Sequence, residues 1–325
     1  MTLAGNGIHR WITSRSGRSV VAVVVIVIAV AAALAGRAAC STNNHGGLAV
    51  PFAAESSWRR TIQQAPPIDP NSAPMIAYTQ RTRGVFANLV EFGIPIFTVA
   101  PDTATYDVKC AGQEWGVCPF AGWPVPIPYG AVPNSGSDGV MVTVDEANST
   151  VFEFWQATKT GSQWSAQWGA INSLRGSGWG GSATGSGASR LAGVIRVAEI
   201  SAGAIPHALA LQTSNACSTF RPPALKSDGK STRADCIPEG AHLQLDPSLD
   251  LSKLGLTKGE LTVATAMQRY GGYIVDAGGA PLSMSFERDA SAAPSALGKA
   301  YQAAGFRWDY DSMDRVPWEK LRVLS

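Results

Sequence analysis

"GVMVTVDEANSTVFEFWQATKTGSQWSAQWGAIN", residues 139–172, contains three strand-length apolar runs joined by short polar turns. We expect strands at 139–145, 150–158 and 164–172, paired as an antiparallel meander. Aromatic side chains fall on both faces of these strands, so other parts of the protein must cover each face. The sequence therefore predicts a mainly β protein, an antiparallel β-sandwich or jelly-roll-like domain with a few peripheral helices.

One face of the central strand carries Glu153 beside Trp155, because side chains alternate across a strand. Two interpretations of this face remain open. In the first, Glu153, Trp155 and Trp168 line a groove, where aromatic rings stack on sugars and a carboxylate binds hydroxyls or moves protons. In the second, the rings fill the core of a sandwich. For the groove, we assign substrate binding to Trp155, Trp168 and Gln156.

The N-terminal part of the chain has the order of an export signal. Arginines precede the uncharged apolar run "SVVAVVVIVIAVAAALAG", which ends in small residues. We therefore expect residues 1–36 to be a signal peptide or a membrane anchor, 37–51 a flexible stalk, and 52–325 a single β-rich extracytoplasmic domain. The protein would be extracellular or anchored to the outer face of the cytoplasmic membrane, with contact to the membrane only through its N-terminal segment.

Charge and cysteine usage narrow the class of protein further. The 26 basic and 24 acidic residues are spread along the chain, so no basic stripe is present and nucleic acid is excluded as a partner. An exported chain with four cysteines in its folded part favours two disulfides, and spacing favours Cys110 with Cys118 and Cys217 with Cys236. Four cysteines allow three connectivities, so the pairing is a prediction.

Outside the meander, the sequence predicts two helices. A short helix is expected in "VIRVAEISAG", ending at Gly203, and a long one in "LTKGELTVATAMQRYGG", with Thr257 as N-cap and Gly271 at its end. Further strands are expected in "PHALALQT", "AHLQLD" and "YIVDAGG". We expect His242 to face solvent and Asp145 to cap a turn.

Four residues are candidates for catalysis: Glu153, His207, Asp276 and Asp138. His207 lies on the more apolar face of its strand, where a general acid or base and a core histidine are both compatible with the pattern. Asp276 ends a buried strand, where a carboxylate is costly unless it is bonded or used. Asp138 lies at the entrance to the first meander strand and can equally form a turn.

Several other chemistries are disfavoured at the level of motifs. The sequence contains no H-E-x-x-H and no G-x-S-x-G, which argues against a zinc peptidase and an α/β-hydrolase. The few histidines make an ordinary zinc site improbable. We expect no cofactor and no metal site, with calcium held by loop carboxylates such as Asp138 as the alternative.

Four segments, "IPHALAL", "IPEGAHLQLDPSLDLSKLG", "VATAMQRYGGYIVDAGG" and "FRWDYDSM", resemble in this order a group of secreted bacterial proteins of the actinobacterial type. The group has His-Ala-Leu, Tyr-Gly-x-x-x-x-Asp and Trp-Asp segments but no established activity. The resemblance spans about residues 52–325 and implies one long domain. This sequence departs from the pattern of the group at Val140, where the group often has a histidine. The positions that match are Asp138, Asp145, Glu153, His207, Asp276, Trp308 and Asp309.

In style, the chain is also similar to lectin- and glucanase-like jelly rolls, which hold sugars on aromatic and carboxylate side chains. We therefore expect a protein that recognises a polysaccharide or cell-wall glycan. Cleavage would use two carboxylates in a hydrolase, or His207 as a base in a lyase. An enzyme requires Glu153, His207 and either Asp276 or Asp138 to meet at one pocket. The alternative is a non-catalytic structural or adhesion module of the cell envelope, with the tryptophans in its core.

Overall fold

The computed structural model describes residues 50–325 apart from residue 182, and these residues belong to one compact unit. The predicted signal peptide or anchor, 1–36, and most of the predicted stalk lie outside the described residues. Within the described part of the chain, no helix has both the length and the apolar character needed to cross a membrane.

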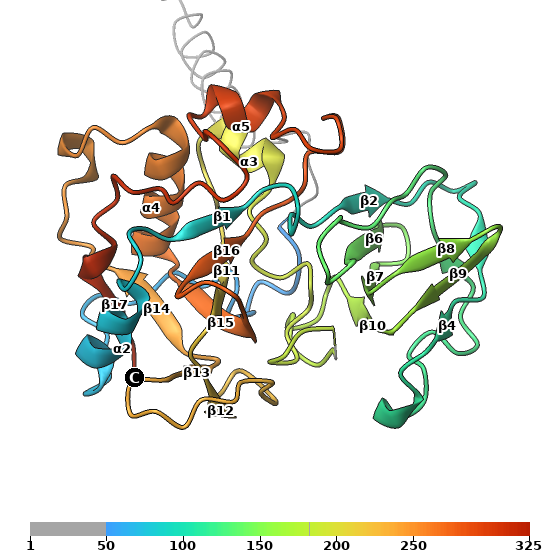
Figure 1. The fold of residues 1–325 in the computed structure, drawn as a ribbon, viewed down its shortest axis with the longest axis horizontal. Helices are drawn as coiled ribbons and strands as arrows, with labels where there is room; N and C mark the ends of the chain where they lie inside the picture. The colour runs from blue at the N-terminus through green and yellow to red at the C-terminus, as the bar shows by residue number, and fades with distance from the viewer. Residues whose placement is uncertain (1–49, 182) are drawn as a thin grey trace, which may run out of the picture. The chain divides into compact units, whose positions relative to one another are not determined.

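A six-stranded sheet with the strand order β1-β16-β11-β15-β14-β17 forms the larger half of the fold (Figure 1). The pairs β1–β16 and β11–β15 are parallel, and the other neighbours are antiparallel. One face packs against α4 and α5 in a large apolar core that contains Leu211, Met284 and Met267. The strands are β1 (Phe86–Asn88), β11 (Leu209–Thr213), β14 (His242–Leu245), β15 (Gly272–Ala277), β16 (Ser283–Ser285) and β17 (Leu321–Val323).

The meander lies in a second, four-stranded sheet with the order β10-β7-β6-β2. Antiparallel pairing of β6 with β7 and of β7 with β10 confirms the predicted meander, and β2 adds a parallel edge. Phe152 and Phe154 face an apolar core of their own, with Phe120 stacked on Phe154. The strands are β2 (Ile96–Thr98), β6 (Met141–Asp145), β7 (Thr150–Trp155) and β10 (Trp168–Ser173).

The third predicted meander strand is divided in the structure. Trp164 belongs to β9 (Gln163–Ala166), which pairs with β8 (Thr158–Thr160) and β4 (Lys109–Cys110) in a separate three-stranded sheet. The preceding predicted strand, 150–158, is divided as well, because Gln156, with a φ of 51°, turns the chain out of β7 before β8 begins. The expectations of continuous strands over 150–158 and over 164–172 were therefore both wrong.

The smaller elements complete a fold that is mainly β, as predicted. The pairing is mixed and not antiparallel throughout, because β2–β6, β4–β9 and β12–β13 are parallel as well. The sandwich or jelly-roll arrangement stays a prediction. The remaining elements are β3 (Thr105–Tyr106), β5 (Val125–Pro126), β12 (Ala216–Phe220), β13 (Ile237–Glu239), α2 (Ser72–Thr79), α3 (Val197–Ala202), α4 (Lys258–Arg269), α5 (Lys299–Ala303) and the 3-10 helices η1 (Gln113–Trp115), η2 (Leu251–Lys253) and η3 (Trp318–Lys320).

Both predicted helices and both predicted disulfides are confirmed. Helix α3 is followed by Gly203 in the left-handed conformation. Helix α4 begins with a capping box, in which the Thr257 side chain accepts from the N–H of Glu260 and the Glu260 carboxylate accepts from the N–H of Thr257. Disulfides join Cys110 to Cys118 and Cys217 to Cys236.

His242 is partly buried, which corrects the expectation that it faces solvent. Its ring stacks on that of Tyr273, the residue opposite it in β15, with the ring centroids 4.2 Å apart. Nε2 lies 2.8 Å from the carbonyl oxygen of Tyr270, to which it donates, and burial lowers the pKa of His242 to about 4. Alternation placed this side chain opposite Leu243 correctly, but the aromatic neighbour comes from a strand distant in sequence.

We expect Thr257→Ala to lower the free energy of unfolding by about 1 kcal/mol, because the N–H of Glu260 loses its capping acceptor. Thr265→Ala is the matched control, since Thr265 lies exposed inside the same helix and its hydroxyl donates only to the carbonyl of Leu261. Alanine has the higher helix propensity, so this control should change stability little. Urea unfolding measures both variants, and equal stability of the two would contradict the capping role.

Candidate functional site

A cavity of about 830 Å³ brings together three tryptophans and three aspartates. We call it the Trp–Asp groove. Its lining also contains Arg190, Lys226 and Lys230, so both signs of charge face the ligand space. The six residues that define the groove are Trp115, Trp155, Trp168, Asp138, Asp228 and Asp276.

The tryptophans form one wall of the groove. Trp155 ends β7 and Trp168 begins β10, and the two are opposite each other in the antiparallel pair. Trp115, in η1, lies over both, with ring centroids 5.6 Å from Trp155 and 5.7 Å from Trp168. The loop that carries Trp115 is closed by the Cys110–Cys118 disulfide. Trp168 is buried and Trp115 is half exposed, so the wall has a fixed base and an open edge.

Asp276 lies on the opposite side, near the end of β15. Its Oδ2 accepts a hydrogen bond from Arg190 Nη1 at 2.7 Å, and its Oδ1 accepts from the N–H of Gly185 at 2.6 Å. Burial raises the pKa of Asp276 and outweighs the lowering by Arg190, while the nearby Asp228 carboxylate raises it further. The groove therefore contains a carboxyl group that holds a proton more readily than an ordinary aspartate.

Asp228 approaches Asp276 closely because a glycine separates them. A Cβ atom at Gly185 would lie 2.4 Å from Asp228 Oδ1, so a side chain there would push the loop away. Asp228 Oδ1 accepts from the N–H of Ala277 at 3.0 Å. Behind it lies Glu239, at the end of β13, which is fully buried. Burial and the neighbouring Asp228 carboxyl group raise the pKa of Glu239 to about 10, so Glu239 is a neutral acid at pH 7.

Glu153 does not line the groove. It is fully buried under the segment that contains Ser189 and Arg190, where it accepts from the Ser189 hydroxyl and from the N–H of Arg190 at 2.9 Å. Burial raises its pKa, while these donors lower it. Alternation placed Glu153 on the face of Trp155, but a distant segment covers it. The expectation that it lines the groove is therefore corrected: its carboxylate holds the backbone of Arg190.

His207 also lies away from the groove. Its Nε2 is 3.0 Å from Glu199 Oε1 and its Nδ1 is 2.8 Å from the carbonyl oxygen of Ala208. Both ring nitrogens face acceptors, which fits a protonated ring. Burial lowers the pKa of His207, but the charge of Glu199 and the hydrogen bonds outweigh burial, so the pKa is raised. The pocket in which Glu153 and His207 were expected to meet an aspartate is therefore not formed.

Of the seven predicted catalytic and binding residues, four come together. Trp155, Trp168, Asp138 and Asp276 line the Trp–Asp groove, whereas Glu153, His207 and Gln156 do not. Gln156 is exposed, and its N–H donates to the carbonyl oxygen of Asp138 at 2.8 Å. This hydrogen bond holds the backbone of Asp138, but Gln156 itself does not line the groove.

Two of the other positions that match the secreted bacterial group, Asp309 and Asp145, make hydrogen bonds that hold the backbone of loops and turns. The Asp309 carboxylate accepts from the N–H groups of three successive residues, Leu89, Val90 and Glu91, and so holds the loop after β1. Asp145 accepts from the N–H of Asn148, which confirms its predicted turn-capping role. Among residues 50–181 and 183–325, no cluster of three or more His, Cys, Asp or Glu side chains is arranged to hold a metal ion.

Sequence reasoning missed Arg190, Trp115 and Glu239. Arg190 stands in a polar loop and Glu239 in "IPEG", which resembles an ordinary turn, so neither has a local signal. Trp115 offered one: an aromatic residue in a loop closed by a short disulfide is held in place and is often exposed.

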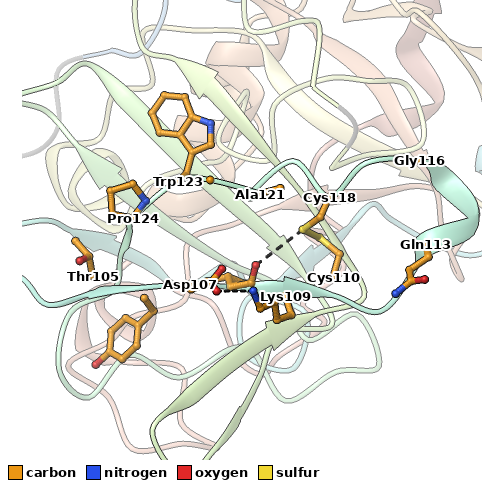
Figure 2. A pocket seen from close by; sticks show the side chains of 13 residues that line it. Thr105, Asp107, Lys109, Cys110, Gln113, Gly116, Cys118, Ala121, Trp123 and Pro124 are labelled. Carbon is orange, nitrogen blue, oxygen red and sulfur yellow. Dashed lines mark hydrogen bonds and ion pairs between the residues drawn. A yellow bond between two sulfur atoms is a disulfide. The ribbon is translucent and has the colours of Figure 1, made fainter.

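A second large cavity, of about 880 Å³, lies beside the Cys110–Cys118 disulfide (Figure 2). Figure 2 shows Asp107 and Lys109 close together and Trp123 on the other side of the opening. Asp107 and Lys109 form an ion pair, and both are largely exposed. The cavity contains none of the predicted catalytic or binding residues and no buried acid, so the Trp–Asp groove is the stronger candidate site.

Comparisons with protein-family models, with curated proteins and with solved structures found no match to this chain. The resemblance to a secreted bacterial group therefore stays a prediction.

We expect Glu153→Ala to lower the free energy of unfolding by about 3 kcal/mol, because it leaves a cavity and two buried donors without an acceptor. Glu153→Gln retains an acceptor oxygen and should cost less. Chemical unfolding of both variants measures the difference. A Glu153→Ala protein as stable as the wild type would show that the carboxylate does not hold Arg190 in place.

The pH dependence of stability tests the His207–Glu199 pair. The pKa of His207 in the folded protein lies above its unfolded value of about 6.5. The full stabilising contribution of the pair is therefore present below about pH 6.5. This contribution is lost as the pH rises through the raised pKa. Relative to His207→Gln, which does not titrate there, the wild type should lose stability from about pH 6 upward. Parallel stability curves for the two proteins would contradict a raised pKa.

Proposed function

We propose that this protein recognises a glycan in the Trp–Asp groove and that the groove carboxylates can cleave a glycosidic bond. The observation that carries the proposal is the presence of the tryptophan wall and Asp276 in one cavity. Tryptophan faces stack on the apolar faces of sugar rings, and carboxylates and cations bind their hydroxyls. The groove volume also lies within the usual range for small-ligand sites.

Hydrolysis is the cleavage chemistry that the groove favours. Glycoside hydrolases use a carboxylic acid with a raised pKa to protonate the leaving oxygen and a second carboxylate as base or nucleophile. Asp276 suits the acid, because burial and Asp228 raise its pKa, and Asp138 or Asp228 suits the second role. A lyase that uses His207 as its base is less well supported, since that ring is paired with Glu199 outside the groove.

The expected setting of this activity is outside the cell. The two disulfides support an oxidising compartment, and we propose that the protein is secreted or anchored at the cell surface, with a polysaccharide or cell-wall glycan as partner. A structural or adhesion module of the envelope is the competing proposal. It predicts neither selective glycan binding nor turnover.

Binding and turnover of the oxidised, purified protein on a panel of bacterial-envelope and plant glycans test the proposal. We expect Trp155→Ala to weaken binding about tenfold through lost stacking, and Asp276→Asn to lower turnover by about 100-fold or more with binding largely retained. Trp123→Ala is the control, because Trp123 is as exposed as Trp115, at 50%, but lies outside the groove.

Each outcome separates the alternatives. Binding that depends on Trp155 without turnover would leave a lectin-like module. Loss of turnover in Glu153→Gln, at unchanged stability, would return Glu153 to the catalytic role that its burial argues against. No binding to any glycan would remove the proposed function and favour the structural module.

A further inference from the structure

A neighbouring cavity of about 580 Å³ adjoins the Trp–Asp groove. The two cavities share four lining residues: Asp138, Arg190, Asp276 and Ala277. The Arg190–Asp276 ion pair therefore stands where the two spaces meet. A ligand longer than the groove can pass this pair and enter the second space, which we call the sheet cavity.

The sheet cavity lies on the second face of the six-stranded sheet. In β1, β16 and β11, which are neighbours, Ala87, Met284 and Leu211 point into the large apolar core. Side chains alternate along a strand, so the residues next to them point the other way. These residues line the sheet cavity: Asn88, Ser283, Ser285 and Gln212. Three adjacent strands thus present amides and hydroxyls to one space.

The polar row is held in a defined arrangement. Gln212 Nε2 donates to the Ser285 hydroxyl at 2.7 Å, and the Ser283 hydroxyl donates to Gln212 Oε1 at 3.1 Å. The Asn88 amide makes no side-chain hydrogen bond within the described part of the chain, although the residue is partly buried. Polar groups withdrawn from bulk water are costly unless they are bonded. The Asn88 amide lines a cavity in which a polar ligand can form a hydrogen bond with it.

The chemistry of the two cavities differs. The Trp–Asp groove contains the tryptophan rings and most of the acids. Away from the junction, the sheet cavity offers uncharged amides and hydroxyls beside apolar and aromatic side chains, which are Phe86, Phe92, Ile94, Val140 and Tyr310. Neutral sugar units, with many hydroxyls and one apolar face, match the lining of the sheet cavity. A bond between a unit in one cavity and a unit in the other would lie beside Asp276 and Asp138.

We infer that the sheet cavity is a second glycan subsite and that a bound chain crosses the Arg190–Asp276 pair with sugar units on both sides. This inference rests on the proposed glycan function. The substrate class it defines is an oligo- or polysaccharide with neutral units on the sheet-cavity side, bound along its length and cut at internal bonds. A glycan bound only by its end would leave one of the two cavities empty.

Chain length is the variable that tests the inference. Isothermal titration calorimetry with chito-, cello- and xylo-oligosaccharides of two to six units compares the wild type with Asn88→Ala and Gln113→Ala. Gln113 is the matched control, because it is an exposed amide that lines the cavity beside the Cys110–Cys118 disulfide. We expect the six-unit sugar of the preferred series to bind at least about tenfold more tightly than the two-unit sugar.

Asn88→Ala should weaken binding of the six-unit sugar about fivefold, through lost hydrogen bonds to hydroxyls, and leave the two-unit sugar on the tryptophans unchanged. Gln113→Ala should change neither. Equal affinity for two and six units in the wild type would overturn the second subsite, and this measurement requires no variant to fold. An unchanged six-unit affinity in folded Asn88→Ala would overturn it as well.

The failure of this inference differs from failure of the proposed function. If short sugars bind and Trp155→Ala weakens them, while length and Asn88 have no effect, the groove keeps its function and the sheet cavity loses its role. If no oligosaccharide of any length binds the wild type, the proposed function and the second subsite both fall.

Discussion

Arg190 connects the two main sheets of this protein, and the candidate site exists because of that connection. Its backbone N–H donates to Glu153 of β7, in the four-stranded sheet. Its guanidinium donates to Asp276 of β15, in the six-stranded sheet, and to the carbonyl of Ala183. A cation with so little exposure is tolerated only when anions and acceptors surround it. The two sheets each supply one carboxylate, and the groove lies where they meet.

The burial of Arg190 beside two carboxyl groups also affects how readily each carboxyl group around the groove holds a proton. Burial raises the pKa values of Glu153 and Asp276, and the positive charge of Arg190 opposes that rise at both. Glu239 has no such cation beside it, and burial with the neighbouring Asp228 keeps it neutral. The carboxyl groups around the groove therefore differ in their tendency to hold a proton, although all are aspartate or glutamate. Such a difference between neighbouring acids is what acid–base catalysis requires.

Much of the fold was predictable because its signals are local. The turns "EANS" and the alternation in β6 and β7 are short-range features, and so are the capping box at Thr257 and the spacing of the cysteines. The parallel pairs were not predictable in this way, since β11–β15 and β1–β16 join segments that are far apart in the chain. The break after Trp155 was missed because a single backbone angle at Gln156 decides it.

The sequence by itself determined which side chains of a predicted strand share a face, as it did for Glu153 with Trp155. It also indicated acids and tryptophans as the candidate residues, and four of those candidates line the groove. Only the tertiary structure decided which of these side chains meet solvent. Glu153 and Trp155 leave the same strand on the same face, yet Ser189 covers one and the groove exposes the other. Strand alternation is set by the local backbone, whereas covering and exposure depend on segments brought together from distant parts of the chain.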